Sequence, residues 1–191
     1  MNILSELSPF SLTTTNRPVN RPEMATAPLK SPARIAGRDE VYVAAMPLRA
    51  TKGPAQLLTS AAYSLKLWDF QHFMVIIRTS SPPSNSQAFV FDFQPEDPEN
   101  VYVALAALSG RSIPGTVLKR KLRKLPKERC WFVGSYGEHA LDVACKFSNH
   151  WETHLKIGHH DCRDYTNGLV EHLTGEKDVL ERLRRSSVDL E

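Results

Sequence analysis

Cysteine is scarce in this chain of 191 residues, and long hydrophobic runs are lacking. Its three cysteines, Cys130, Cys145 and Cys162, include no C-x-x-C pair and are too few for a disulfide framework. Such sparse cysteine usage is typical of a reducing compartment, so we predict a cytoplasmic protein. Because no stretch of about 18 apolar residues occurs, no membrane-spanning helix is expected.

Metal-binding patterns are lacking as well. A structural zinc site built on the three cysteines would need a fourth ligand from His159 or His160, at an unfamiliar spacing. The sequence therefore predicts neither a metal ion nor another cofactor.

The excess of positive charge is small. The chain has 24 Lys and Arg against 21 Asp and Glu, and a net charge of +3 does not by itself indicate a nucleic-acid partner. The segment from Lys119 to Arg129 is nevertheless strongly basic, with seven basic residues and one acidic residue. This segment fits either a solvated turn and strand edge or a surface for an anionic partner, such as an acidic protein, lipid headgroups or RNA. It lacks the interleaved aromatic residues that would favour RNA.

The first 38 residues carry several prolines and the run Thr13-Thr14-Thr15, with no sustained hydrophobic period, which predicts a disordered segment. No apolar stretch of the secretory type is present there. Because the segment is rich in Ser and Thr and poor in acids, a transit peptide is the alternative, with a plastid or another organelle as the location. We expect one folded domain over residues 39–175 and a C-terminal helix and tail over residues 176–191.

What is present indicates an ordinary globular core, with 41% hydrophobic and 24% charged residues. Apolar periodicity and turn residues predict an α+β fold in which a small antiparallel sheet packs against helices. The predicted strands are 39–47, 70–78, 87–93, 116–118, 129–133 and 155–157, and the predicted helices are 57–68, 101–108, 138–151, 162–174 and 177–185.

The best-marked element is the helix predicted over residues 162–174, which would begin with a cysteine. Asp161 is suited to cap its N-terminus, and Asp164, three residues later, can return a bond to the cap. Gly175 stands where a left-handed residue would end the helix. The helix dipole and the unpaired N–H groups of the first turn favour a thiolate at Cys162. The alternative is that Cys162 is a small buried apolar residue.

The two strands predicted around Pro82 and Pro83 would form a β-hairpin. If the hairpin folds symmetrically about these prolines, His72 on the first strand lies directly opposite Asp92 on the second. A buried aspartate needs a partner, and an imidazole N–H is a suitable one. A slip of one residue would turn Asp92 to the other face of the sheet.

Cys162, His72 and Asp92 together supply the groups of a nucleophilic thiol site. Cys162 would attack, His72 would take the thiol proton and return it to the leaving group, and Asp92 would orient the imidazole. The backbone N–H of Cys162 would be one donor to the oxyanion. The alternatives are that His72 is a hydrogen-bonded core residue, or that His159 or His160 acts as the base.

The order of these elements, with a strand histidine, a hairpin and then a cysteine at a helix start, resembles the circularly permuted papain-like fold of the NlpC/P60 superfamily. Its lecithin–retinol acyltransferase-like and PPPDE-type branches carry an Asn-Cys-x-x-Phe signature, for which this chain has Asp161-Cys162-Arg163-Asp164-Tyr165. The likeness covers roughly Val41 to Gly175. It implies that Cys162 is the nucleophile, that His72 is the base, and that an amide or acyl group is cleaved or transferred.

We therefore predict a cysteine hydrolase, a peptidase or amidase, that uses Cys162, His72 and Asp92. The first alternative is a non-catalytic module of the same fold that binds an acidic partner through Lys119 to Arg129. The second is an acyltransferase, although the C-terminal membrane anchor usual for that activity is not expected here.

Overall fold

The computed structural model describes residues 37–47, 71–80 and 88–188. The helix predicted at residues 57–68, most of the predicted turn around Pro82 and Pro83, and residues 1–36 of the predicted N-terminal segment lie outside these residues.

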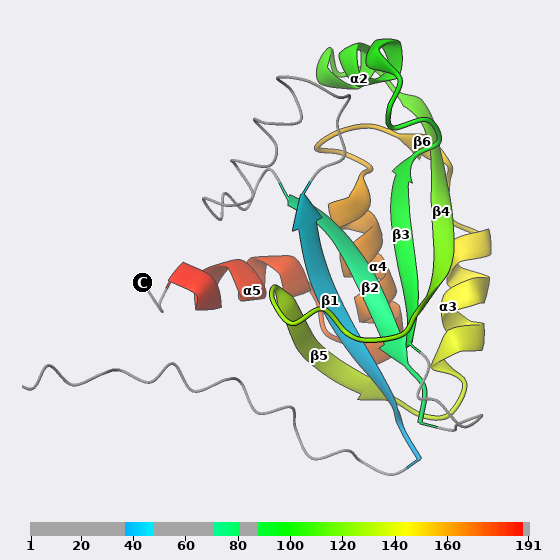
Figure 1. Cartoon of the computed structure of the whole chain (residues 1–191), viewed down its shortest axis with the longest axis vertical. Coiled ribbons are helices and arrows are strands. Elements are labelled where there is room, and N and C mark those ends of the chain that lie inside the picture. Colours follow the sequence, from blue (N-terminus) through cyan, green and yellow to red (C-terminus); the bar gives the residue numbers. More distant parts are fainter. Residues whose placement is uncertain (1–36, 48–70, 81–87, 189–191) are drawn as a thin grey trace, which may run out of the picture. The chain divides into compact units, whose positions relative to one another are not determined.

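Six antiparallel strands form one sheet in the part of the chain that the structure describes, in the order β5-β1-β2-β3-β4-β6 (Figure 1). Strands adjacent in sequence are therefore mostly adjacent in the sheet, and β5 returns to pair with β1. Helices and this sheet confirm the α+β class. The strands are β1 Asp39–Pro47, β2 Gln71–Arg78, β3 Ala88–Pro95, β4 Ile113–Leu122, β5 Cys130–Tyr136 and β6 His154–Leu155.

The main hydrophobic core lies between one face of the sheet and the helices. Val41, Phe73, Val75 and Phe91 face it from the central strands because side chains alternate between the two faces of a strand. The helices described are α2 Val101–Leu108, α3 Ala140–Asn149, α4 Cys162–Thr174 and α5 Val179–Val188. Among them, α4 makes the most extensive contacts with the strands. The opposite face carries a smaller apolar cluster that includes Tyr42, Met74 and Ile76.

Strand β4 is much longer than the predicted strand at residues 116–118. It extends through Leu122 because its basic residues continue the ladder with β3, where Lys119 pairs with Phe91 and Arg120 with Val90. The first part of the basic segment is thus regular strand, paired with β3 on one side, while β6 pairs only with Ile113 and Pro114. The predicted strand edge is therefore confirmed at Lys119 and Arg120, where Lys119 is exposed, whereas the predicted turn was wrong for these two residues because both belong to β4.

Strands β2 and β3 pair over only part of their length. Their ladder runs from Arg78 opposite Ala88 to Val75 opposite Phe91. Beyond that point β2 stays paired with β1, and β3 stays paired with β4, so the two strands diverge toward the end of the sheet where α4 begins (Figure 1). We call this opening between residues 71–74 and 92–95 the fork.

No helix in the ranges that the structure describes is long and apolar enough to cross a membrane.

Candidate functional site

Cys162 is the first residue of α4, and a complete capping box holds it there. The Arg163 backbone N–H donates to Asp161 Oδ1 (2.8 Å), and the Asp161 N–H donates to Asp164 Oδ2 (2.9 Å). Gly175 ends the helix with a φ of 76°. The predicted limits of this helix and its caps are confirmed.

The Asp161 side chain also ties the preceding turn to the helix. The Gly158 N–H donates to Asp161 Oδ2 (2.7 Å), and the Arg163 guanidinium lies 3.2 Å from the same oxygen. Burial opposes ionisation of Asp161, but these hydrogen bonds and the Arg163 charge outweigh it and hold the pKa of Asp161 below its ordinary value. The backbone on both sides of Cys162 is therefore fixed.

His72 and Asp92 meet across the fork. The His72 Nε2–H donates to Asp92 Oδ1. His72 also lies within hydrogen-bonding and charge-interaction range of the Cys162 side chain. All three residues are buried, with 8% of His72, 1% of Asp92 and 8% of Cys162 exposed. The imidazole is thus within interaction range of both the carboxylate and the thiol.

The predicted route to this contact was wrong, because His72 and Asp92 are not a directly opposed pair. The β2–β3 register pairs Val75 with Phe91, which is offset by two residues from the symmetric hairpin, and the ladder ends before His72 is reached. In the sheet, Met46 faces His72 from β1, and Leu118 faces Asp92 from β4. Since an offset of two residues keeps a side chain on the same face, the two groups still meet in the fork.

The charge state of His72 follows from its neighbours. Burial on its own lowers the pKa of an imidazole, but the negative charge on Cys162 and the hydrogen bonds to Asp92 and Cys162 act in the opposite direction. Together they raise the pKa of His72 from 6.5 to about 10. His72 is therefore protonated near neutral pH when Cys162 is a thiolate.

Arg120 completes the group and was not predicted. Its Nη2 lies 2.6 Å from Asp92 Oδ2, so the two carboxylate oxygens have different cationic partners. Alternation along β4 puts Arg120 on the same face as Leu118, which is the ladder partner of Asp92. The contact between Arg120 and Asp92 depends on the β3–β4 pairing. The only feature of the sequence that pointed to Arg120 was the basic segment to which it belongs.

A small apolar pocket opens beside the thiol. Its volume is about 130 Å³, enough for about four water molecules at liquid density. The pocket is lined by Gln71, His72, Phe93, Pro95, Ala107, Leu155, Ile157, Asp161, Cys162 and Arg163. Gln71 Oε1 is buried and has no hydrogen-bond partner in the described structure. A glutamine at the start of a strand carries no functional signal, so Gln71 was not among the predicted residues.

The other predicted bases are placed differently. His160 stacks on Trp151 with ring centroids 4.7 Å apart, and its Nε2–H donates to the Glu152 carbonyl oxygen (3.0 Å). His159 is exposed. Neither residue lines the pocket with Cys162, so the structure favours His72 as the partner of the thiol.

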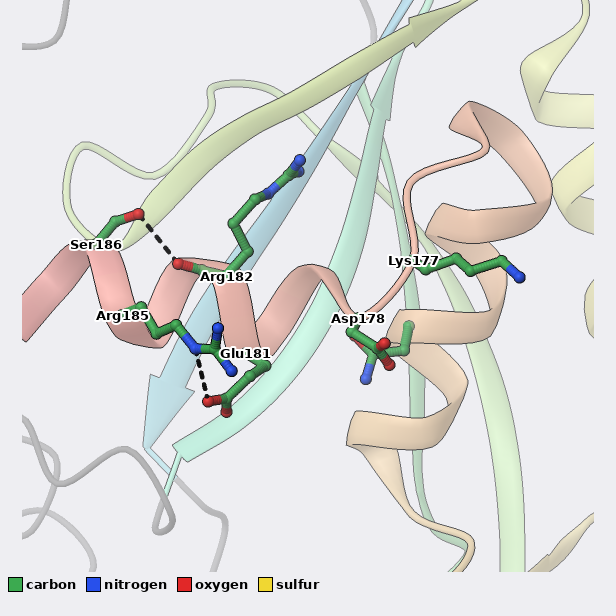
Figure 2. Close-up of a pocket in the computed structure, with 7 residues that line it drawn as sticks. Lys177, Asp178, Glu181, Arg182, Arg185 and Ser186 are labelled. Atoms are coloured by element: carbon green, nitrogen blue, oxygen red, sulfur yellow. Dashed lines mark hydrogen bonds and ion pairs between the residues drawn. The ribbon is translucent and has the colours of Figure 1, made fainter.

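A larger depression, of about 500 Å³, lies where α5 follows α4 (Figure 2). Charged side chains of α5 line it and pair with one another, as Arg185 does with Glu181 at 3.2 Å. No cysteine or histidine contributes to its lining. It therefore lacks a thiol such as that of Cys162.

The groups required for thiol chemistry thus meet at the fork, with a pocket beside them. Comparisons of the chain with protein-family models, curated proteins and solved structures find no match, so the function has to be argued from this geometry.

Proposed function

We propose that the protein is a thiol-dependent hydrolase that cleaves an amide or a related acyl bond with Cys162 as the nucleophile. One observation carries the proposal: the His72 imidazole bonds the Asp92 carboxylate and lies within interaction range of the Cys162 thiol, beside an apolar pocket. A nucleophile, a base and a group that orients the base are the parts required for covalent catalysis by a thiol.

Acylation begins from the thiolate–imidazolium pair. The Cys162 sulfur attacks the substrate carbonyl carbon, and the C=O π electrons move to oxygen to form a tetrahedral intermediate. When the C–N bond breaks, His72 gives its proton to the departing nitrogen. The products of this half-reaction are a free amine and a thioester on Cys162, with His72 neutral.

Deacylation uses the same residues in reverse. Neutral His72 takes a proton from water while the water oxygen attacks the thioester carbonyl. Collapse of the second tetrahedral intermediate breaks the C–S bond, which releases a carboxylic acid and restores the thiolate beside imidazolium. Because Nε2 of His72 is held by Asp92, Nδ1 is the ring nitrogen left to exchange these protons.

Two groups are positioned to stabilise the oxyanion. The backbone N–H of Cys162, in the first turn of α4, has no acceptor within its own helix. The Gln71 carboxamide lines the same pocket, and its NH₂ group is the second donor in this proposal. The acyl group of the substrate then packs against the apolar wall of the pocket, which Phe93, Leu155 and Ile157 form.

A permuted papain-like domain is the fold that we propose for this hydrolase. In its support, the histidine precedes the cysteine in the chain, and the cysteine begins a helix that packs on an antiparallel sheet. Asp161 in place of the signature asparagine serves as the helix cap, a role that aspartate fills as well as asparagine.

Site-resolved labelling tests the proposal directly. We expect iodoacetamide at pH 7 to alkylate Cys162 at least tenfold faster than Cys130 or Cys145, because the thiolate is the reactive species. Burial raises the pKa of Cys130 to about 11, so that thiol serves as an internal control. Mass spectrometry of the quenched digests measures all three rates.

The second arm of the experiment looks for the intermediate. A panel of p-nitrophenyl esters and peptide anilides with apolar acyl groups should leave a thioester on Cys162 and none on Cys162→Ala. Equal alkylation of the three cysteines, or labelling of Cys162 that His72→Ala leaves unchanged, would reject the proposed site.

A second candidate function is the binding of an acidic partner through the basic segment. After Lys119 and Arg120 are assigned to the sheet, Lys121, Arg123, Lys124 and Lys127 remain exposed around the turn between β4 and β5. Clustered exposed cations attract an anionic surface. This function does not need Cys162.

A further inference from the structure

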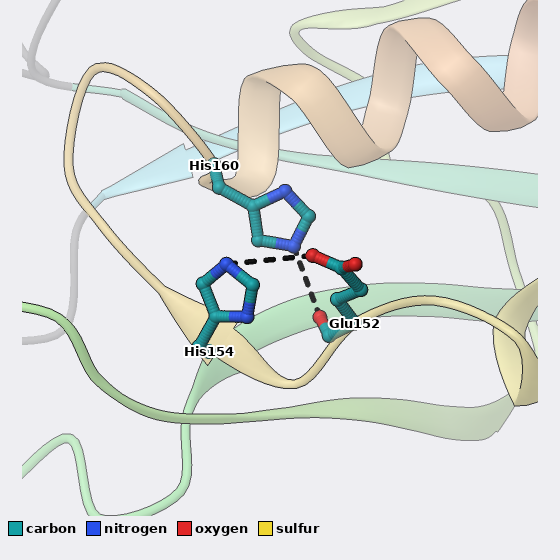
Figure 3. Close-up of side chains that lie close together, drawn as sticks. All are labelled: Glu152, His154 and His160. Atoms are coloured by element: carbon teal, nitrogen blue, oxygen red, sulfur yellow. Dashed lines mark hydrogen bonds and ion pairs between the residues drawn. The ribbon is translucent and has the colours of Figure 1, made fainter.

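We propose that Glu152, His154 and His160 form a binding site for Zn²⁺, a site that does not depend on the proposed hydrolase chemistry. One ligand atom from each of these residues lies within 4.8 Å of the other two. His154 Nε2 is 3.4 Å from Glu152 Oε2, and the rings of His154 and His160 stack with their centroids 4.9 Å apart, so the three side chains converge (Figure 3). No other group of three or more such residues within the described ranges meets this criterion.

The donor set indicates the metal. Two imidazole nitrogens with one carboxylate oxygen suit Zn²⁺, whereas Mg²⁺ and Ca²⁺ prefer oxygen ligands throughout. Two histidines and a glutamate also occur as the protein ligands of open zinc sites, in which water takes the fourth position. The site on this chain is exposed enough to keep such a water.

The three ligand atoms can approach one another closely enough to bind zinc, because two of the side chains can move and the third is fixed. Zinc bonds of about 2.0–2.2 Å place the ligand atoms of a tetrahedral site about 3.3–3.6 Å apart, so the atoms must move together by about 1 Å. The side chains of Glu152 and His154 are 71% and 59% exposed, which leaves them free to rotate. His160 is half-buried and stacked on Trp151 at 4.7 Å with the ring planes 12° apart, so it is the fixed member.

The tautomer of His160 has to change when the metal binds. Its Nε2 points toward Glu152 and His154, and Nε2–H donates to the Glu152 carbonyl oxygen (Figure 3). A zinc ion takes the Nε2 lone pair, so the ring proton moves to Nδ1 and the carbonyl oxygen is released to water. This loss is modest because Glu152 is exposed and water can replace the bond.

Zinc at this site joins two segments that flank the pocket. Glu152 and His154 lie before and within β6, whereas His160 lies in the turn that leads to Cys162. The His160 ring also packs edge-on against Phe93, which lines the pocket, with centroids 5.6 Å apart. The bound ion therefore holds one wall of the pocket and the approach to α4, as a structural clamp.

Metal titration of the full-length protein tests the site. The Cys162→Ser variant is used as the parent so that this thiol cannot bind the probe, and Co²⁺ and Zn²⁺ are the probes. We expect one equivalent of Co²⁺ to give d–d absorption bands typical of four or five ligands. Zinc, measured by competition with a chromophoric chelator, should displace it and bind with micromolar or tighter affinity.

Exposed residues supply the variants, so that folding is not at issue. His154→Ala and Glu152→Gln should each weaken zinc binding at least tenfold and remove the absorption bands. His159→Ala is the matched control, because this exposed histidine adjoins His160 and lies outside the cluster, and it should bind as the parent does. Zinc should also raise the melting temperature of the parent and not that of His154→Ala, since a ligand of the native state stabilises it. Equal affinity in the parent and His154→Ala, or equal loss in His159→Ala, would overturn the proposal.

Discussion

Asp92 divides its two oxygens between two cations. One oxygen accepts from the His72 ring, and the other lies 2.6 Å from Arg120. A carboxylate bound in this way cannot rotate, so it fixes the plane of the imidazole as well as its tautomer. In the proposed mechanism Arg120 is therefore a positioning residue that acts through Asp92.

Replacing Asp92 by asparagine tests this role. We expect Asp92→Asn to lower turnover tenfold or more and to slow alkylation of Cys162 near neutral pH, because the imidazolium that accompanies the thiolate loses its negative partner. Since Asp92 is 1% exposed and bonds two charged groups, unfolding should also become easier by about 1–3 kcal/mol. Kinetics and urea denaturation measure the two effects.

Asp142→Asn is the control for that experiment, because Asp142 is an exposed aspartate on α3 and should change neither quantity. In a His72→Ala background, Asp92→Asn should add little to the loss of turnover, since residues that act as one unit are strongly non-additive. Losses that multiply would mean that Asp92 and His72 act separately.

His72 gives the expected pH dependence of the site. Its pKa is raised to about 10, so the imidazolium, which would donate a proton to the leaving group in the proposed reaction, persists well above pH 7. Activity should hold through mildly alkaline pH and fall as the pH approaches 10, where His72 loses that proton. In Cys162→Ser, the thiolate charge that contributes to the raised pKa is gone, and NMR titration should show a lower His72 pKa. An imidazole that titrates near 6.5 in both proteins would contradict this account.

At the scale of the element, α4 could be predicted to the residue because its signals are local. Asp161, Asp164 and Gly175 act on backbone groups within one turn of their own positions, so no tertiary information was needed. The capping residues also determine where the thiol lies. The same holds for α2, whose predicted and observed limits agree.

The caps of α4 lead to a prediction about both stability and reactivity. Asp161→Ala removes the acceptor for Gly158 N–H and Arg163 N–H, and we expect a loss of about 1–2 kcal/mol in unfolding free energy with slower alkylation of Cys162. Asp161→Asn keeps a side-chain oxygen for the cap and should lose less. Urea denaturation of the three proteins at pH 7 separates these cases.

The sign of the pH effect provides a further check on Asp161. Because its pKa is lower in the folded protein, the carboxylate stabilises the fold above the unfolded-state value of about 3.9, and this contribution is lost as the pH falls through the folded-state value. The stability difference between wild type and Asp161→Asn should therefore shrink between pH 5 and pH 2. A difference that does not change with pH would mean that the charge of Asp161 contributes nothing.

The strands could be predicted less well, since their limits depend on pairing. Strand β4 extends into Lys119 and Arg120 because β3 offers hydrogen-bonding partners there, which composition alone cannot reveal. The fork likewise depends on β1 and β4 holding the outer edges of β2 and β3. Cys162, His72 and Asp92 could be chosen from the chemistry of their side chains. How His72 and Asp92 meet, and that Arg120 and Gln71 lie beside them, could be seen only in the three-dimensional structure.

At the scale of the whole molecule, the basic residues of the segment from Lys119 to Arg129 differ in what they contact. Lys119 and Arg120 are used within the fold, since Lys119 Nζ donates to Cys145 Sγ at 3.0 Å and Arg120 binds Asp92. The exposed residues Lys121, Arg123, Lys124 and Lys127 are available to a partner. A charge-reversal experiment must therefore leave Arg120 unchanged.

If the basic segment binds an acidic partner, replacing Lys121, Arg123 and Lys124 by glutamate should abolish retention of the protein on a column of immobilised poly-glutamate. Retention of the wild type should also weaken with salt, because exposed charges are screened beyond about 8–10 Å at physiological ionic strength. Elution from the column in a salt gradient measures both. Lys146→Glu, at an exposed position on α3, is the control. If the triple variant is retained as strongly as the wild type, the basic segment is not the binding surface.

The fork has a consequence for how the protein is made. His72 and Asp92 are separated by 20 residues, and Cys162 is supplied much later, so no single stretch of the chain carries a working set of groups. Cys162 is synthesised after its two partners, so on the proposed function it can be activated only when β1 and β4 have taken their places beside β2 and β3. On the proposed function, a reactive Cys162 would thus report a finished fold, and a newly made or partly unfolded chain would be spared a nucleophile that attacks its neighbours.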